Sequence, residues 1–179
     1  MKYPHIAFFD CETSGLDPNT HEMLSLAIIR VEAKTFNVVG EYYKKIRPVR
    51  IHLAQAKALE INGYSAERWS DAVDMREALN EATGLLQNAV WAGHNVNFDV
   101  DYLRASYAQH GITIPKNDYH KFDTMLVAYP WLVRGEISSL SLDSCCKFFG
   151  INRPSPHDAL DDVKATVSLA RRMIFGTTA

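Results

Sequence analysis

Acidic side chains are the residues of this sequence whose types and spacing could support chemistry. Asp10 and Glu12 stand two residues apart where a short apolar run, residues 6–9, ends. In a strand, positions i and i+2 face the same side of the sheet, so these two carboxylates converge. Asp99 comes soon after a second apolar run, residues 89–92. Because open α/β sheets bind ligands beyond the carboxyl ends of their strands, we expect all three acids to gather at that edge.

His157 and Asp162 flank the start of the last segment with helical periodicity and could add an imidazole and a fourth acid. Carboxylates in one pocket repel, by about 4 kcal/mol for a pair about 4 Å apart at an effective dielectric near 20. Mg²⁺ or Mn²⁺ would neutralise such an all-oxygen ligand set. Two such ions about 3.5–4 Å apart can hold the attacking and leaving oxygens of a phosphoryl displacement. A histidine, with an ordinary pKa near 6.5, suits proton transfer from the attacking water.

Each of these groups also has an ordinary structural interpretation. The Asp10–Glu12 pair could simply be solvated at a strand end or cap the next turn. Asp99 would be favoured near a helix N-terminus by the helix dipole alone. His157 could be a loop histidine with satisfied hydrogen bonds. Spacing by itself leaves these alternatives open.

Composition narrows the class of protein. A chain of 179 residues favours a single domain, residues 1–179. Its 47% apolar and 22% charged residues are typical of a soluble globular protein. No apolar run approaches the roughly 18 residues of a membrane span, and the N-terminal run is too short for a signal peptide. We therefore expect no membrane association.

Cysteine content indicates the cellular compartment, and net charge limits how the protein could bind nucleic acid. Three cysteines, two of them adjacent, form neither a disulfide framework nor a spaced zinc site, which favours a reducing, cytoplasmic location. A net charge of −2 excludes a protein that holds nucleic acid by bulk electrostatics. A transient nucleic-acid substrate held by metal ions and local patches remains compatible with it.

The elements that must position the acids follow from hydrophobic periodicity and turn signals. Strands are expected at residues 6–9, 24–31, 38–46, 89–92 and 119–122. Helices are expected at residues 53–61, 71–88 after a Ser70 cap, 98–110, 124–129 before Pro130, from Ser141 to Gly150, and 158–175. Three successive strands followed by alternating strands and helices predict an α/β fold with a mixed sheet.

The acidic stretches resemble the motifs of the DEDDh 3′→5′ exonuclease family, which includes polymerase III proofreading subunits, ribonuclease T and exodeoxyribonuclease X. Residues 9–16, Phe-Asp-Cys-Glu-Thr-Ser-Gly-Leu, resemble the first motif, and residues 93–103 resemble the second. Residues 157–162, with His and the last Asp five apart, are similar to the third. Ser14 replaces the more usual Thr, and Cys145 stands where the family often has Leu. The resemblance runs from about residue 5 to residue 174.

The resemblance implies an RNase H-like fold with a five-stranded mixed sheet flanked by helices. It also implies a metal-dependent enzyme that hydrolyses phosphodiester bonds at DNA 3′ ends and releases nucleoside 5′-monophosphates. Its partner would be single-stranded DNA or a DNA 3′ end, and a DNA polymerase or repair protein could accompany it. Two alternatives stay open: an exoribonuclease that trims RNA ends, and a non-catalytic nucleic-acid-binding subunit. Because no further domain is evident, we expect a free-standing enzyme or a small subunit.

Roles carry over from the family residue by residue. Asp10 would bridge two Mg²⁺ or Mn²⁺ ions, and Glu12 and Asp162 would complete the tighter site. Asp99 would hold the second ion, largely through water. His157 would be the general base.

The resemblance also implies a pocket for the terminal nucleotide. Thr13, Ser14, Gly15 and Leu16 would line it, with Leu16 beside the last base. Phe98 could stack near the penultimate base, and an ordinary core position for this ring is an equal alternative.

Several nearby residues leave a choice. Either Asp161 or Asp162 could be the acid of the third motif. On a helical wheel Asp162 lies closer to the apolar stripe, which favours it only slightly, and the family spacing selects Asp162. Asp158 and Asp123 are interpreted as helix caps. His94 could orient Asp99, but a structural role in its loop is favoured. Strand alternation turns Cys11 away from Asp10 and Glu12, so it is expected to be a buried, apolar-like side chain.

Overall fold

The sheet is the element on which every predicted site residue depends. The computed structural model describes residues 3–176. Its strands are β1 (His5–Thr13), β2 (Met23–Glu32), β3 (Val38–Lys45), β4 (Val90–Gly93) and β5 (Lys121–Asp123). They form one five-stranded sheet in the order β3-β2-β1-β4-β5. The β1–β2 and β2–β3 pairs are antiparallel, and the β1–β4 and β4–β5 pairs are parallel. The predicted mixed sheet is confirmed.

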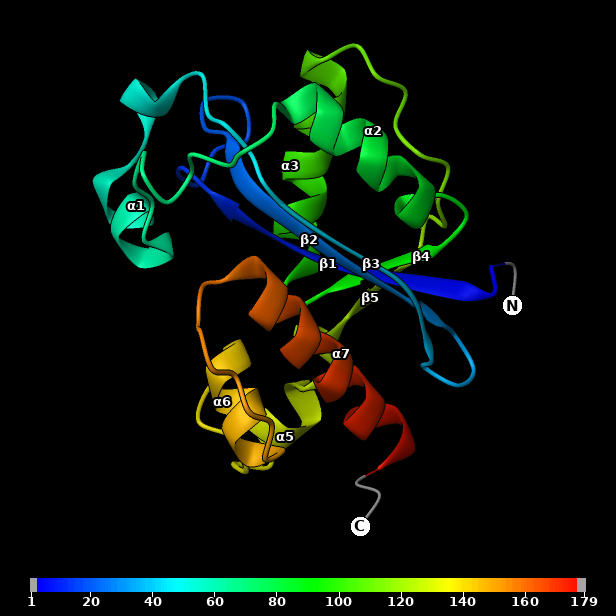
Figure 1. Ribbon diagram of the computed structural model, residues 1–179. Helices are drawn as coiled ribbons and strands as arrows, with labels where there is room; N and C mark the ends of the chain where they lie inside the picture. The colour runs from blue at the N-terminus through cyan, green and yellow to red at the C-terminus, as the bar shows by residue number, and fades with distance from the viewer. Residues whose placement is uncertain (1–2, 177–179) are drawn as a thin grey trace.

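Helices cover both faces of this sheet (Figure 1). They are the 3₁₀ helix η1 (Ile51–Leu53), α1 (Ala56–Asn62), α2 (Met75–Leu86), α3 (Val96–Gln109), α4 (Thr124–Val127), α5 (Tyr129–Val133), α6 (Leu142–Phe148) and α7 (Ala159–Phe175). Figure 1 shows α2 and α3 on one side of the sheet, and α7 with α5 and α6 on the other. This α/β arrangement matches the RNase H-like fold that the family resemblance implied.

Strand β1 is buried on both faces because it is the central strand, which explains its nearly continuous apolar sequence. Phe9 faces the core formed with α2 and α3, and Phe8 faces the core formed with α7. The Phe9 ring meets Trp91 edge-on, with 5.5 Å between ring centroids. This packing holds the carboxyl end of β1 in a fixed place beneath the helices.

Helix α7 has a wider buried face than the apolar stripe of its sequence predicts. Val163 and Ala170 pack on the sheet, while Ala165 and Leu169 pack against α6. Ile174, which continues the apolar period of Leu160, Val163, Val167 and Ala170, is 48% exposed. The helix therefore lies between the sheet and α6, and both neighbours bury part of its surface.

Several predicted helix boundaries are wrong. The helix expected from residue 71 begins at Met75, and the side chain of Asp74, not Ser70, accepts its capping hydrogen bond, from the Glu77 amide. Pro130 does not end the helical segment before it but lies in the first turn of α5. Proline is tolerated there because a first-turn amide has no partner within the helix. In addition, the helix expected from residue 53 begins at Ala56, because residues 51–53 form the separate turn η1. The caps at Asp123, Ser141 and Asp158 are confirmed.

The structure can be compared with the expectations that the chain has no disulfide framework and no membrane span. Cys11, Cys145 and Cys146 are buried and unpaired. Among residues 3–176, none of the helices has the length and the apolar character that crossing a bilayer requires. The cytoplasmic location stays a prediction.

Candidate active site

Three carboxylates meet where β1 ends and α7 begins. Side-chain oxygens of Asp10, Glu12 and Asp162 all lie within 4.8 Å of one another. Asp10 and Glu12 project from the same face of β1, as the i, i+2 spacing predicts. Asp162 reaches them from the first turn of α7 and is only 5% exposed, whereas Asp161 lies outside this cluster. This group of carboxylates could hold a divalent cation.

Asp99 lies beside the cluster rather than within it. It occupies the first turn of α3 and is 4% exposed. Its Oδ1 accepts hydrogen bonds from the backbone amide of Cys11 at 2.9 Å and from the Cys11 thiol at 3.2 Å. All four acids line one cavity of about 290 Å³, together with His157. The structure thus brings together all five residues that the sequence singled out.

Cys11 is buried, as predicted, and makes a contact that the sequence did not predict. Strand alternation does turn its side chain away from Asp10 and Glu12, into the core on the α3 side. That same direction places the thiol against Asp99, so Cys11 lines the cavity and is a hydrogen-bond donor rather than only an apolar-like filler. The predicted buried position is thus confirmed, and the contact with Asp99 is an additional feature that arises because α3 brings Asp99 to this face of β1.

Arg153 is a residue of this site that sequence reasoning missed. Its Nε and Nη2 donate to Oδ1 and Oδ2 of Asp162 at 2.5 and 2.6 Å. The two side chains are 9% and 7% exposed, so the ion pair is buried. Arg153 precedes the third motif in a proline-containing loop, and no periodicity or family spacing marks it.

Burial and mutual repulsion dominate the electrostatics of the cluster. Burial, followed by the charges of Asp99, Glu12 and Asp162, raises the pKa of Asp10 well above its ordinary value. Burial and the neighbouring carboxylates raise the pKa of Glu12 to about 8. The positive charge of Arg153 opposes both shifts. Such carboxyl groups ionise readily only when a cation is supplied, which fits an all-oxygen site for a hard divalent ion.

The pKa of Asp99 is also raised by burial, and hydrogen bonds partly oppose the shift. Burial raises the pKa of its carboxyl to about 7, while the hydrogen bonds from Cys11 favour the charged form and oppose that shift. A shared proton between these acids, or a cation, is therefore needed to relieve the repulsion in the cavity.

His157 stands at the mouth of the cavity. Its backbone has a φ of 64°, in the left-handed region, and its side chain is exposed. Its amide donates to Oδ2 of Asp162 at 3.3 Å, which ties the loop to the carboxylate cluster. Residues held at positive φ are found often where a functional group must be presented in one direction. Its imidazole is thus free to meet water at the edge of the site.

The first-motif residues form the adjoining wall of the cavity. Thr13, Gly15 and Leu16 line it, and Leu16 is 73% exposed at the rim. A Cβ on Gly15 would lie 2.4 Å from the ring of His21, so only glycine fits there. Ser14 was also expected to line this pocket, but it is not among the lining residues. Its side chain is buried and accepts a hydrogen bond from the Glu22 amide.

Phe98 and helix α1 complete that wall. Phe98 lines the cavity and also packs against the core, so both readings of this ring hold in part. Ile61 and Asn62, which we did not predict to line the site, also line the cavity. Ile61 is 45% exposed, and the Asn62 side-chain amide donates to the Thr13 carbonyl at 3.0 Å. Residues 58–64 resemble the family's segment after the third strand, and that resemblance is the sequence signal that could have identified them.

His94 and Asp123 have structural partners, as predicted. The two ring nitrogens of His94 pair with the Thr124 hydroxyl and the Leu140 carbonyl, so the ring fixes the loop rather than Asp99. The Asp123 carboxylate accepts from the amides of Asn95, Val96 and Met125. It therefore caps α4 and also fixes the start of α3, the helix that carries Asp99.

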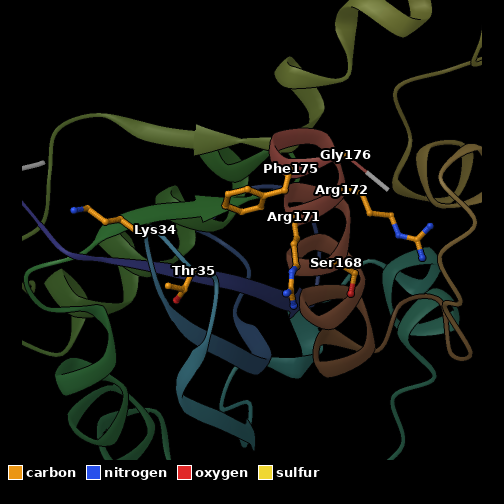
Figure 2. A pocket seen from close by; sticks show the side chains of 7 residues that line it. All are labelled: Lys34, Thr35, Ser168, Arg171, Arg172, Phe175 and Gly176. Atoms are coloured by element: carbon orange, nitrogen blue, oxygen red, sulfur yellow. The ribbon is translucent and has the colours of Figure 1, made fainter. Parts of the chain in front are cut away.

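A second cavity, larger than the one that holds the acids, lies at the other end of α7 and has no carboxylate among the described residues that line it. It measures about 530 Å³ and is lined by Lys34, Thr35, Ser168, Arg171, Arg172, Phe175 and Gly176. Figure 2 shows that Lys34 and Arg172 point to opposite sides of it. Arg172, in the last turn of α7, meets the negative end of the helix dipole and donates to the Phe149 carbonyl, so it has a structural role without a ligand. No site residue predicted from the sequence lines this cavity.

Comparisons with known proteins agree with this geometry. A protein-family model described as an exonuclease matches residues 7–170. The chain is 29% identical over 167 residues to the PolC-type DNA polymerase III of Thermotoga maritima, and 25% identical over 169 residues to that of Bacillus subtilis. These matches cover 92% and 93% of this chain but only 11% of each polymerase.

Solved structures show the same fold. Escherichia coli exonuclease I in complex with a dT13 oligonucleotide superposes with a TM-score of 0.81 at 23% identity, over 96% of this chain and 42% of that one. Exonuclease I from Methylocaldum szegediense gives a TM-score of 0.78 at 23% identity, over 97% and 41%. The chain thus spans a small part of the curated relatives and less than half of these solved chains.

Proposed function

The chain belongs to the exonuclease family, in its DEDDh branch, and from that premise we propose that it hydrolyses the terminal phosphodiester bond at DNA 3′ ends and releases nucleoside 5′-monophosphates. The observation that carries the proposal is the cluster of Asp10, Glu12 and Asp162, with Asp99 in the same cavity. The DNA-polymerase relatives and the exonuclease I structures bound to DNA oligonucleotides support DNA as the substrate.

Asp10, Glu12 and Asp162 would hold one Mg²⁺ or Mn²⁺ ion, and Asp99 would hold a second together with Asp10. When bound, these ions would supply the positive charge that holds the attacking and leaving oxygens of the phosphodiester. The raised pKa values of Asp10 and Glu12 support this assignment, because these carboxyl groups need cations to ionise.

The protein's own groups would orient the reaction. His157, at the mouth of the cavity, would take the proton of the attacking water on a ring nitrogen. Cys11 would hold Asp99 in one orientation through its amide and thiol. Thr13, Gly15 and Leu16 would receive the terminal nucleotide against the apolar surfaces of Phe98 and Ile61.

Matched DNA and RNA oligonucleotides with the same sequence and a 5′ label test this function. With Mg²⁺ or Mn²⁺ we expect stepwise shortening of the single-stranded DNA from its 3′ end, and no shortening with chelator or in Asp10→Ala. The electrophoretic ladder and the mononucleotide product are the readouts. Faster shortening of RNA than of DNA would favour the exoribonuclease alternative, and normal activity of Asp10→Ala would refute the assigned site.

The relatives are much longer than this chain and include a DNA polymerase, which suggests a type of partner. Because this sequence matches a small part of PolC-type polymerases, association with a DNA polymerase or a repair protein is part of the proposal. Co-purification with a polymerase subunit from cells that express the tagged protein would support that partner.

A further inference from the structure

Arg153 and Asp162 form an ion pair unlike the others in this protein. Both side chains are less than 10% exposed. In every other ion pair among residues 3–176, at least one side chain is more than a quarter exposed. Exposed pairs contribute little to stability, whereas breaking a buried pair leaves an uncompensated charge. One member of this buried pair, Asp162, belongs to the carboxylate cluster that the proposed activity needs.

The geometry of the pair fixes the plane of the Asp162 carboxylate. The planar guanidinium of Arg153 engages both oxygens, at 2.5 and 2.6 Å, in the fork arrangement that arginine alone can make. Oδ2 also accepts from the His157 amide. Since each carboxylate oxygen has two lone pairs, Oδ1, which accepts from Arg153 Nε, keeps capacity for a cation, and one oxygen of this carboxylate lies within 4.8 Å of oxygens of Asp10 and Glu12.

The charge of Arg153 also suits the site. Four carboxylates face one cavity, and Arg153 is the cation in hydrogen-bond contact with one of them. With two divalent ions and Arg153, the centre would carry one net positive charge, which matches the single negative charge of a phosphodiester. Without Arg153 the loaded centre would carry no net charge.

We propose that Arg153 is a positioning residue, whose two hydrogen bonds hold the Asp162 carboxylate toward Asp10 and Glu12 and thereby set the affinity of this cluster for a divalent ion. This inference rests on the proposed function, because it takes Asp162 as a metal ligand. Partners that orient a metal-binding side chain typically change metal affinity 10- to 100-fold when they are removed.

Arg153→Lys separates orientation from charge. Lysine keeps the positive charge but is a flexible point donor that cannot engage both oxygens. We expect the Mn²⁺ dissociation constant, measured by calorimetry without nucleic acid, to rise about 10- to 100-fold. The metal-free thermal midpoint should stay within about 4 °C of the wild type, since the charge is retained. An unchanged Mn²⁺ affinity would overturn the inference.

Arg153→Gln tests the charge, and Arg172→Lys is the matched control. Loss of the buried cation should lower the metal-free midpoint of Arg153→Gln by about 6–20 °C. Arg172 lies at the far end of α7 and donates to the Phe149 carbonyl, so its Lys variant should bind Mn²⁺ like the wild type. An equal loss in Arg172→Lys would show a general effect on α7 and refute the inference. If the wild type binds no Mn²⁺, the proposed function fails as well.

Discussion

At the scale of single residues, Asp161 and Asp162 are chemically identical neighbours with opposite surroundings. Asp162 is buried, paired with Arg153, and within 4.8 Å of Asp10 and Glu12. Asp161 is partly exposed and lies outside that group. The difference is one helical step of about 100°, which turns one carboxylate into the cavity and the other out of it.

This difference predicts unequal effects of the same substitution. Asp162→Asn should lower the rate of single-stranded DNA hydrolysis at least about 100-fold, because the amide removes a charged ligand. Asp161→Asn should retain activity within about twofold, as surface changes usually do. Initial rates with a labelled oligonucleotide measure both. A larger loss in Asp161→Asn than in Asp162→Asn would show that the third-motif acid has been assigned to the wrong residue.

At the scale of elements, the acids depend on helix starts and strand ends. Asp99 lies in the first turn of α3, and that start is fixed by the Asp123 carboxylate at the end of β5. Since β5 and β4 are parallel neighbours, a three-residue strand sets the position of a helix that approaches the site from the far face.

Asp123→Ala tests this dependence. Removal of a capping side chain costs about 0.5–2 kcal/mol, and here three amides lose their acceptor, so we expect a loss near 2 kcal/mol. For a chain of this size the thermal midpoint should fall by about 4–8 °C. Asp74→Ala, which removes a cap from α2 alone, is the matched control and should cost about 1 kcal/mol. A smaller loss for Asp123 than for Asp74 would contradict the shared-cap interpretation.

At the scale of the whole molecule, the fold keeps mutually repelling acids together at the expense of stability. The folded state raises the pKa of Glu12 from 4.5 to about 8. Between these two values the folded protein binds a proton that the unfolded chain releases, so its stability falls as the pH rises through that window. A divalent ion bound by the folded state offsets the loss by mass action.

Thermal unfolding at two pH values measures this coupling. With chelator present, raising the pH from about 6 to about 8 should cost roughly 2 kcal/mol through Glu12, at 1.36 kcal/mol per pKa unit. The midpoint should fall by about 4–8 °C. Saturating Mg²⁺ should remove most of that decrease, and Glu12→Gln should reduce it without metal, leaving the part due to Asp10 and Asp99. A midpoint that rises with pH in chelator would contradict the raised pKa.

Much of this protein follows from its sequence alone. The apolar run before Asp10 predicted a buried central strand, and the period of two placed Asp10 and Glu12 on one face. The helix end near residue 61 and the caps at Ser141 and Asp158 follow from local chemistry, because helix ends and caps depend on nearby residues. The motif spacing selected Asp162 and His157, and the structure places both at the cavity.

Tertiary structure decided what distant residues contribute. Ile61 and the Cys11 contact with Asp99 join segments far apart in the chain, and the Arg153–Asp162 pair joins a loop to a helix nine residues apart. No local period encodes either kind of meeting. The wider buried face of α7 depends on α6 packing against it, which a helical wheel cannot include. Local propensity acts through neighbours in sequence, whereas orientation, burial and charge compensation arise only when separate segments share one low-dielectric space.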